Sequence, residues 1–166
     1  CAATYYVDKP MTKRGFSTRY VTYSEGVFVG YRGYDRSQVK PLYPFGHGLT
    51  YTTFEYSDLR VTQAKGGCDV QITLTNTGTY DASEVVQVYV GEVNPSVPRP
   101  VKELKAFKKA HLAAGESQVL NFRLDNEAFA FYDVESHDWK VNSGQFNVYV
   151  GASAGDVRLN EFVNIR

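Results

Sequence analysis

The sequence predicts an all-β protein, a β-sandwich of about seven strands preceded by an irregular N-terminal arm. Three observations support this class. From residue 67 onward, apolar and polar residues alternate with a period of two, which is typical of strands with one buried face. Each alternating run is short and ends at residues that favour turns. No run of ten residues has the periodicity of a helix.

Seven segments are the expected strands, in chain order residues 52–61, 68–76, 83–91, 102–112, 117–125, 144–151 and 156–165. Their number and total length are typical of immunoglobulin-like or fibronectin-like sandwiches. Leu74, Val88, Phe122 and Val148 lie on the apolar sides of four runs, so we expect them in the core. The segment 102–112 is rich in Lys, which suits a sheet edge.

Three shorter predictions concern less regular sequence. Residues 126–131 are expected to form one helical turn or a bulge. Trp139 is expected to cap the core near a loop, with its indole N–H donating to a carbonyl. In the Tyr- and Gly-rich arm and junction, residues 1–53, one strand is expected at Val27 to Tyr31, and the sandwich would occupy residues 54–166.

Composition limits the functional classes. The chain has 166 residues, of which 43% are apolar, which is enough for a packed core. Its 18 basic and 18 acidic residues cancel, so overall charge favours neither nucleic acid nor an anionic membrane as a partner. No apolar run is long enough to span a bilayer, and no Cys/His spacing fits zinc. Of Cys1 and Cys68, the second is expected to be a buried thiol.

The most distinctive segment runs from Leu42 to Tyr56, LYPFGHGLTYTTFEY. Pro41 and Pro44 hold the preceding residues extended, and the glycines beside His47 permit turns. This segment resembles the junction at which the second catalytic domain of glycoside hydrolase family 3 enzymes meets a C-terminal fibronectin type III-like domain. The segments EGVFVGYRGYD, NTGTYDASEVVQVYV, RPVKELKAFKK and AFYDVESHDWKVNSGQFNVYVGASAGDVRL resemble the same family in the same order.

The resemblance implies a role. Family 3 enzymes are mostly retaining β-glucosidases and β-xylosidases, which need a carboxylate nucleophile and a carboxylic acid/base. In the family both lie upstream of the segments resembled here, so no catalytic residue and no cofactor is assigned to this chain. The implied partners are the catalytic domains of a parent glycosidase, which would be a β-glucosidase and would be secreted or periplasmic.

Four arm residues, Glu25, Tyr31, Arg32 and Tyr34, are candidates for the border of a sugar subsite. Arg and carboxylates bind hydroxyl groups, and tyrosine rings stack on pyranose rings. The alternative is structural: Arg32 would pair with Glu25 or Asp35, and the tyrosines would pack. We also expect the arm to self-associate or to lie on its own sheet, and to be cleaved by proteases between Lys9 and Arg19.

Two functional hypotheses stay open. One is a non-catalytic accessory domain that packs against catalytic domains and stabilises them. The other is a module that binds an oligo- or polysaccharide and docks the enzyme on its substrate. The second hypothesis needs a row of exposed aromatic rings, and Tyr89 and Tyr149, opposite the valine faces, are the expected surface aromatics. An intact small enzyme is disfavoured, because no paired acid and base is evident.

The remaining polar residues have structural interpretations. His47 is expected to be a hydrogen-bonded structural histidine, and His111 and His137 to be solvated. A basic cluster is expected to form a solvated edge and an acidic cluster to form a charged loop without calcium. These clusters are, respectively, Lys102, Lys105, Lys108 and Lys109, and Asp133, Glu135 and Asp138.

Overall fold

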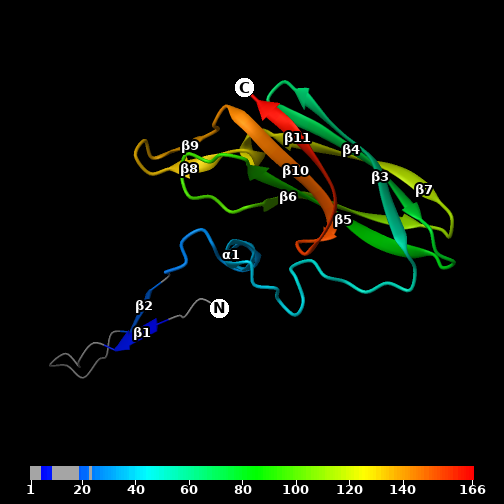
Figure 1. Cartoon of the computed structure of the whole chain (residues 1–166), viewed down its shortest axis with the longest axis horizontal. Coiled ribbons are helices and arrows are strands. Elements are labelled where there is room, and N and C mark those ends of the chain that lie inside the picture. The colour runs from blue at the N-terminus through cyan, green and yellow to red at the C-terminus, as the bar shows by residue number, and fades with distance from the viewer. Residues whose placement is uncertain (1–4, 9–18, 23) are drawn as a thin grey trace.

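A computed structural model describes residues 5–8, 19–22 and 24–166, with side chains described from residue 24 onward. Two antiparallel sheets face each other (Figure 1). One contains, in spatial order, β3 (Phe54–Ala64), β4 (Gly67–Asn76) and β7 (Ser117–Asp125). The other contains β11 (Asp156–Ile165), β10 (Gly144–Ser153), β5 (Ala82–Glu92) and β6 (Glu103–Leu112). The predicted sandwich and its seven strands are confirmed.

Smaller elements accompany the sandwich: β1 (Tyr5–Asp8), β2 (Arg19–Thr22), α1 (Tyr31–Ser37), η1 (Asn126–Ala128), β8 (Phe131–Asp133) and β9 (Asp138–Lys140). The turn η1 confirms the expected helical turn. The strand expected at Val27 to Tyr31 is wrong, because the Phe28 N–H donates to the Glu25 carbonyl in a turn and α1 starts at Tyr31. Among the described residues, no helix is long and apolar enough to cross a membrane.

The core lies between the two sheets and follows the alternation of the strands. Its central side chains are almost fully buried, and all four predicted core residues belong to it: Leu74, Val88, Phe122 and Val148. The thiol of Cys68 is buried as expected, whereas Cys1 lies outside the described residues. Burial raises the pKa of the Cys68 thiol to about 11.

Side chains close the two edges where the sheets meet. The Lys-rich strand β6 is at the edge of its sheet, as predicted, and Lys108 donates to the Asn121 carbonyl of β7. On the other side, Arg158 of β11 donates to the Phe54 carbonyl, and Glu161 accepts from the Val61 N–H of β3. Glu161, which disturbs the alternation of the last strand, therefore satisfies an edge N–H group.

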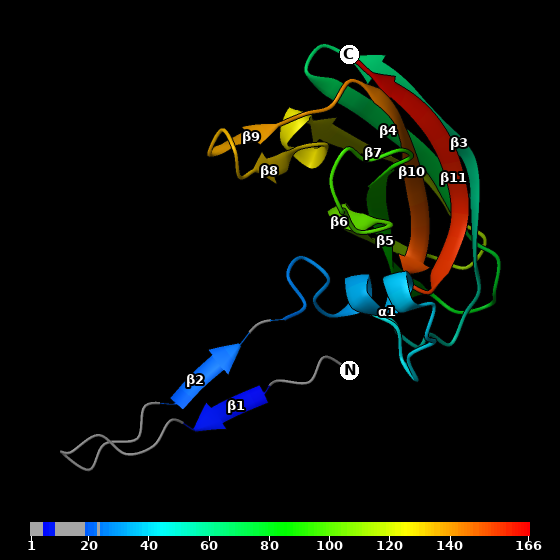
Figure 2. The same ribbon diagram turned by 60° about the vertical axis from the view of Figure 1, so that its left-hand side comes forward.

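The predicted role of Trp139 is wrong. Trp139 lies on the hairpin β8–β9, outside both sheets (Figure 2), and its side chain is 67% exposed. Its ring meets that of the cross-strand residue Tyr132 edge to face, with centroids 5.7 Å apart. The nearby end of the core is filled by Phe129 and Phe146, which are fully buried. Two phenylalanines leave no space there for the indole.

The N-terminal segment, defined here as residues 24–53, lies below the four-stranded sheet in Figures 1 and 2. It covers the outer face of β5, so residues 86 to 91 are buried without interruption instead of alternating. The expected proteolytic stretch between Lys9 and Arg19 lies, apart from Arg19 in β2, outside the described residues.

Candidate functional site: the contact between the N-terminal segment and the sandwich

Tyr89 is at the centre of the contact. It points to the outer face of β5, yet its side chain is fully buried, so the prediction that it is a surface aromatic is wrong. Its cross-strand neighbour Tyr149 is partly buried. The alternating pattern placed both rings correctly on the outer face, but it contains no signal that the N-terminal segment covers this face. These two tyrosines therefore do not form an exposed aromatic row.

Tyr31, the first residue of α1, covers Tyr89. Its ring stacks on Phe45 with centroids 4.9 Å apart and meets Tyr89 edge to face at 6.0 Å. Its hydroxyl oxygen accepts from the Leu104 N–H of β6 at 2.8 Å. Such a ring contributes apolar burial, while its hydroxyl group satisfies a backbone donor at the edge strand. Tyr31 is therefore held against the sandwich at both ends of its side chain.

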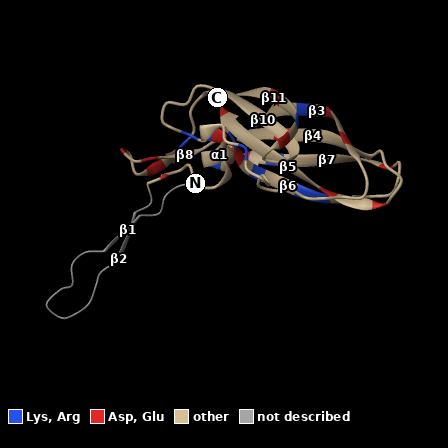
Figure 3. Cartoon of the chain, turned by 60° about the horizontal axis from the view of Figure 1, so that its bottom comes forward, with Lys and Arg blue, Asp and Glu red and all other residues tan. Residues whose placement is uncertain are grey.

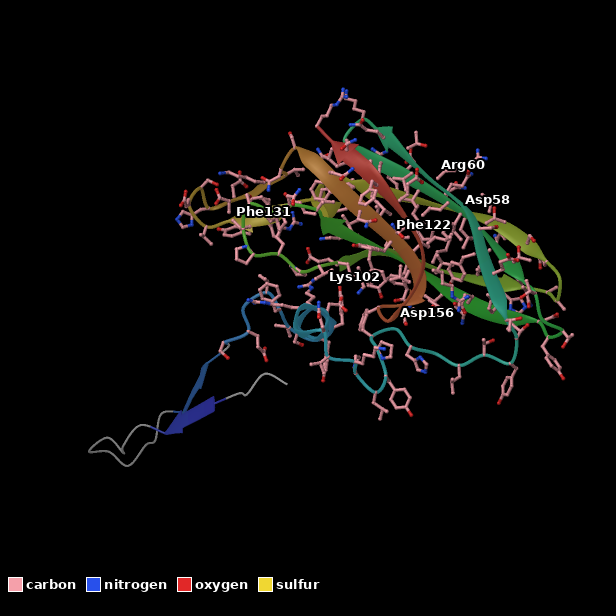
Figure 4. The ribbon with its side chains drawn as sticks, in the orientation of Figure 1. Asp58, Arg60, Lys102, Phe122, Phe131 and Asp156 are labelled. Atoms are coloured by element: carbon pink, nitrogen blue, oxygen red, sulfur yellow. The ribbon has the colours of Figure 1, made fainter. Side chains whose placement is uncertain are left out.

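Two ion pairs join α1 to the start of β6. Arg32 lies 3.1 Å from Glu103, and the Lys102 ammonium donates to Asp35 at 2.6 Å. In Figure 4, Lys102 lies beside α1. The expected pairing of Arg32 with Glu25 or Asp35 is wrong, because α1 presents both charges to β6. We call the residues of the two ion pairs and of the Tyr31–Leu104 hydrogen bond the arm interface: Tyr31, Arg32, Asp35, Lys102, Glu103 and Leu104.

The basic cluster is divided by this contact. Lys102 is buried, so the expected solvated edge is wrong for this residue, whereas Lys108 and Lys109 are exposed as expected. Lys105 lies 3.6 Å from Glu103, and burial lowers its pKa. In Figure 3, basic and acidic positions are interspersed over the molecule, in agreement with the zero net charge.

Arg99 lies beside the arm interface, with its guanidinium 3.6 Å from the Glu103 carboxylate. It is almost completely buried and donates to the Glu92 carboxylate at 2.8 Å. It also donates to the Phe129 carbonyl at 3.0 Å and the Ala130 carbonyl at 3.2 Å, at the end of η1. A guanidinium group with several fixed acceptors is well suited to a buried ion pair. The loop between β5 and β6, which carries Lys102, is thereby fixed in place.

The junction, residues 38–53, is held at a second place through Gln87. The Gln87 amide donates to the carbonyls of Ala152, at 2.6 Å, and Gly46, at 3.4 Å, and accepts from the Tyr89 hydroxyl at 2.6 Å. Gly46 has a φ of 81°, and a Cβ there would lie 2.4 Å from Gln87. Both its conformation and its surroundings therefore require glycine.

A third contact fixes the end of the junction. Thr52 donates to the side-chain oxygen of Asn76 at 2.6 Å, and Asn76 is fully buried. The Asn76 amide donates in turn to the carbonyls of Tyr80 and Leu112. A buried amide with all its bonds made can specify one arrangement of the chain. This asparagine opens the NTG segment noted in the sequence.

The four candidate subsite residues are not brought together as one site. Tyr31 and Arg32 belong to the arm interface. Tyr31 and Tyr34 line one pocket of about 260 Å³, whereas Glu25 and Tyr34 line another of about 540 Å³, where the Arg36 guanidinium lies over the Phe28 ring. The carboxylates of the arm interface are held in ion pairs, which suits anchoring better than proton transfer. Lys102, expected only in a solvated basic cluster, and Glu103 were not predicted to take part in a contact, although the RPVKEL segment contains both residues.

The remaining candidates are peripheral. The His47 ring is exposed and tilted against Tyr43, with centroids 5.4 Å apart, and the hydrogen bond at this residue is made by its backbone N–H. His111 and His137 are exposed, as expected. In the acidic loop, Asp133 accepts from Lys140 and Ser136, which holds its pKa well below the ordinary value. Residues 24–166 and the two described N-terminal strands contain no cluster of three or more His, Cys, Asp or Glu able to hold a metal.

Comparison with known proteins identifies similar chains. Residues 84–154 match the family model of the fibronectin type III-like domain. The chain is 46% identical over 149 residues to thermostable β-glucosidase B of Acetivibrio thermocellus, covering 87% of this chain and 20% of that protein. It is also 46% identical over 141 residues to exo-α-(1→6)-L-arabinopyranosidase of Bifidobacterium longum, covering 83% of this chain and 18% of that protein.

Solved structures of β-glucosidases are also similar to this chain. The GH3 β-glucosidase of Bifidobacterium adolescentis superposes with a TM-score of 0.85 at 44% identity, over 87% of this chain and 22% of that one. β-Glucosidase 3B of Thermotoga neapolitana, solved with glucose, superposes with a TM-score of 0.82 at 39% identity, over 87% of this chain and 20% of that one. The chain thus spans about a fifth of the length of the proteins that it matches.

Proposed function

Because the chain carries the C-terminal fibronectin type III-like domain of glycoside hydrolase family 3 β-glucosidases, we propose that it is a non-catalytic accessory domain of such a glycosidase. In this role it packs against the catalytic domains and stabilises them. The function is scaffolding, and the sugar chemistry belongs to the other domains.

One observation carries the proposal: an apolar patch on the junction. Leu42, Tyr43, Leu49 and Tyr51, here called the junction patch, expose between 70% and 95% of their side chains. Contiguous exposed apolar residues mark interaction surfaces. The junction is held in place by Gln87 and Thr52, so its backbone is fixed while these four side chains stay outside. Such a surface is suited to contact with the domains that make up the rest of the matched glycosidases.

Two further observations support a non-catalytic role. The carboxylates of the arm interface and of Glu92 are held in ion pairs with Arg or Lys. A β-glucosidase and an arabinopyranosidase are also equally similar to this chain, at 46% identity. A domain shared at the same level by enzymes named for different sugars does not set the choice of sugar. Docking on a polymer is less well supported, since Tyr89 is buried.

A domain exchange tests the proposal. This chain replaces the matching region of thermostable β-glucosidase B, which keeps its own catalytic part. We expect an active chimera, and the double substitution Leu49→Ser with Tyr51→Ser should shorten its half-life at elevated temperature several-fold with KM unchanged. Val134→Ser, on the β8–β9 turn and 72% exposed, is the matched control.

Equal half-lives for the patch variant and the control would contradict the scaffolding role, and a changed KM for the glucoside would point to a part in the substrate site. The chain alone gives a second test. It should not hydrolyse aryl β-glucosides, and turnover that disappears on substitution of one of its own carboxylates would overturn the non-catalytic assignment.

A further inference from the structure

A polar pocket lies where the junction passes the turn between β10 and β11. Its volume is about 260 Å³, slightly below the usual range for ligand pockets. Figure 4 labels Asp156, which lies at this end of the sandwich. The lining comes from the junction, β3, β5, β10 and β11, and its polar side chains include Thr52, Glu84, Ser153, Asp156 and Arg158.

Ser153 is the first sign that the pocket serves a ligand. Its side chain is only 2% exposed, and its hydroxyl oxygen has no hydrogen-bond partner among the described residues. A buried hydroxyl without a partner destabilises the fold, and most such groups in proteins are satisfied. Ser153 lines the pocket, so a turn of its side chain toward the pocket would let a molecule bound there supply the missing bond.

Glu84 is the second sign. One of its carboxylate oxygens accepts from the Tyr56 hydroxyl at 2.8 Å, and no described residue bonds to the other. Desolvation by burial raises the pKa of Glu84. A ligand hydroxyl that donates to the second oxygen would replace the water that burial removed. The pocket therefore offers a free acceptor from β5 and a free hydroxyl from β10.

Arg158 and Asp156 fix the opposite wall. The Arg158 guanidinium donates to the Phe54 carbonyl at 2.6 Å, pairs with Asp156 at 3.0 Å, and lies over the Tyr56 ring. These contacts hold the wall in place before any ligand arrives. The charged lining is mixed, with two carboxylates and one guanidinium group, so it favours a neutral polar molecule over an anion. A metal is not favoured, since no described cluster has three suitable ligands.

We propose that this pocket binds one neutral, hydroxyl-rich molecule of monosaccharide size, with one ligand hydroxyl donating to Glu84 and another bonded to Ser153. The site is additional to the scaffolding role, and its lining includes none of the four residues of the junction patch. Each hydroxyl group of such a ligand can both donate and accept a hydrogen bond, whereas an ammonium group only donates and a carboxylate only accepts.

NMR titration of the 166-residue chain tests the site, with D-glucose and glycerol as separate probes. We expect saturable shifts of the amide signals around Ser153, Asp156 and Thr52, with a Kd for glucose on the order of 1–10 mM. Tighter binding of glucose than of glycerol is the expected result, and equal binding would refute the monosaccharide size assigned to the ligand.

Matched variants locate the binding. Ser153→Ala should weaken it about fivefold and Glu84→Gln about tenfold. Ser153→Ala should also leave the melting temperature unchanged or higher, because it removes an unsatisfied group. Ser136→Ala and Glu135→Gln, both on the β8–β9 turn, are the controls and should bind as the wild type does.

Three further results would overturn the proposal: no saturable shift with either probe, shifts confined to residues outside the pocket, or equal losses in the pocket variants and the controls. None of these results bears on the domain exchange described above, which depends on the junction patch. The two proposals can therefore fail independently.

Discussion

The core between the sheets and the contact on the outer face of β5 are built on different principles. In the core, alternating apolar residues from both sheets share one volume, and many residues could fill it. At the outer face, single polar groups meet single partners: Asp35 meets Lys102, and the Tyr31 hydroxyl oxygen meets the Leu104 N–H. The core depends on pattern and volume, whereas the contact depends on the identity of particular residues.

This difference predicts how the two regions respond to substitution. A core residue should be replaceable by another of similar volume but not by a smaller one. A contact residue should tolerate no loss of its functional group, even when the volume is kept. Four experiments, with five substitutions, follow in order of decreasing expected effect.

The largest effect is expected in the core. Leu74→Ala and Phe122→Ala should each lower the free energy of unfolding by about 2–5 kcal/mol, since each leaves a cavity between the sheets. Denaturant melts measure this. Val119→Ala, on the exposed side of β7, is the control and should cost little. Losses below about 0.5 kcal/mol in the two core variants would mean that the buried faces are wrongly assigned.

The next effect belongs to the arm interface. Asp35→Asn keeps the volume but leaves the buried Lys102 ammonium without a counter-charge, so it should cost about 1–3 kcal/mol. Hydrogen exchange should rise mainly in α1 and the junction and not in β4. Glu25→Gln is the control, because the Glu25 side chain makes no hydrogen bond or ion pair with the described residues. Uniform loss of protection across both sheets would show that this contact and the core unfold as one unit.

Gly46→Ala should act on the junction alone. The new methyl group meets Gln87 at a φ of 81°, which disfavours any residue with a Cβ, and the expected cost is about 1–2 kcal/mol. Solvent exposure of Tyr89 should increase, which tyrosine absorbance can follow. Gly48→Ala, where a Cβ has open space, is the matched control. Equal stability of the two variants would refute the requirement for glycine at residue 46.

The smallest effect concerns pH. Burial raises the pKa of Glu84, so its neutral form is favoured in the folded state. Its favourable contribution is full below its ordinary pKa of about 4.3 and is lost as pH rises through the raised value. Glu84→Gln should thus gain stability relative to the wild type between pH 4 and pH 7, by less than about 1 kcal/mol. Thermal melts of both proteins at pH 4 and pH 7 measure this difference. A loss of stability in Glu84→Gln relative to the wild type over this range would contradict a raised pKa for Glu84.

The same contrast explains how much the sequence could predict. Alternation placed Leu74, Val88, Phe122 and Val148 correctly, because burial between two sheets has a period of two residues. A Lys-rich run placed β6 correctly at an edge, since lysine protects exposed strand edges. These features depend on local sequence, so they can be read without knowing what else is nearby.

The arm interface could not be predicted in this way. Arg32 and Glu103 are 71 positions apart, and neither has a periodic signal that selects the other. The strand expected at Val27 to Tyr31 was wrong for a related reason. Valines between glycines form a strand only where a partner strand is available, and the local sequence does not show whether one is. The expected exposure of Tyr89 failed because the pattern describes the faces of a sheet but not what covers them.

The location of Trp139 has a practical consequence for every experiment that follows unfolding. It is the only tryptophan in the chain, and it is already largely in water on a hairpin outside the two sheets. Its emission will therefore be long-wavelength in the native protein and will change little when the sandwich melts. Far-ultraviolet circular dichroism, or a tryptophan introduced at Phe122, will report the loss of the core, while the natural indole acts as a local probe of the hairpin.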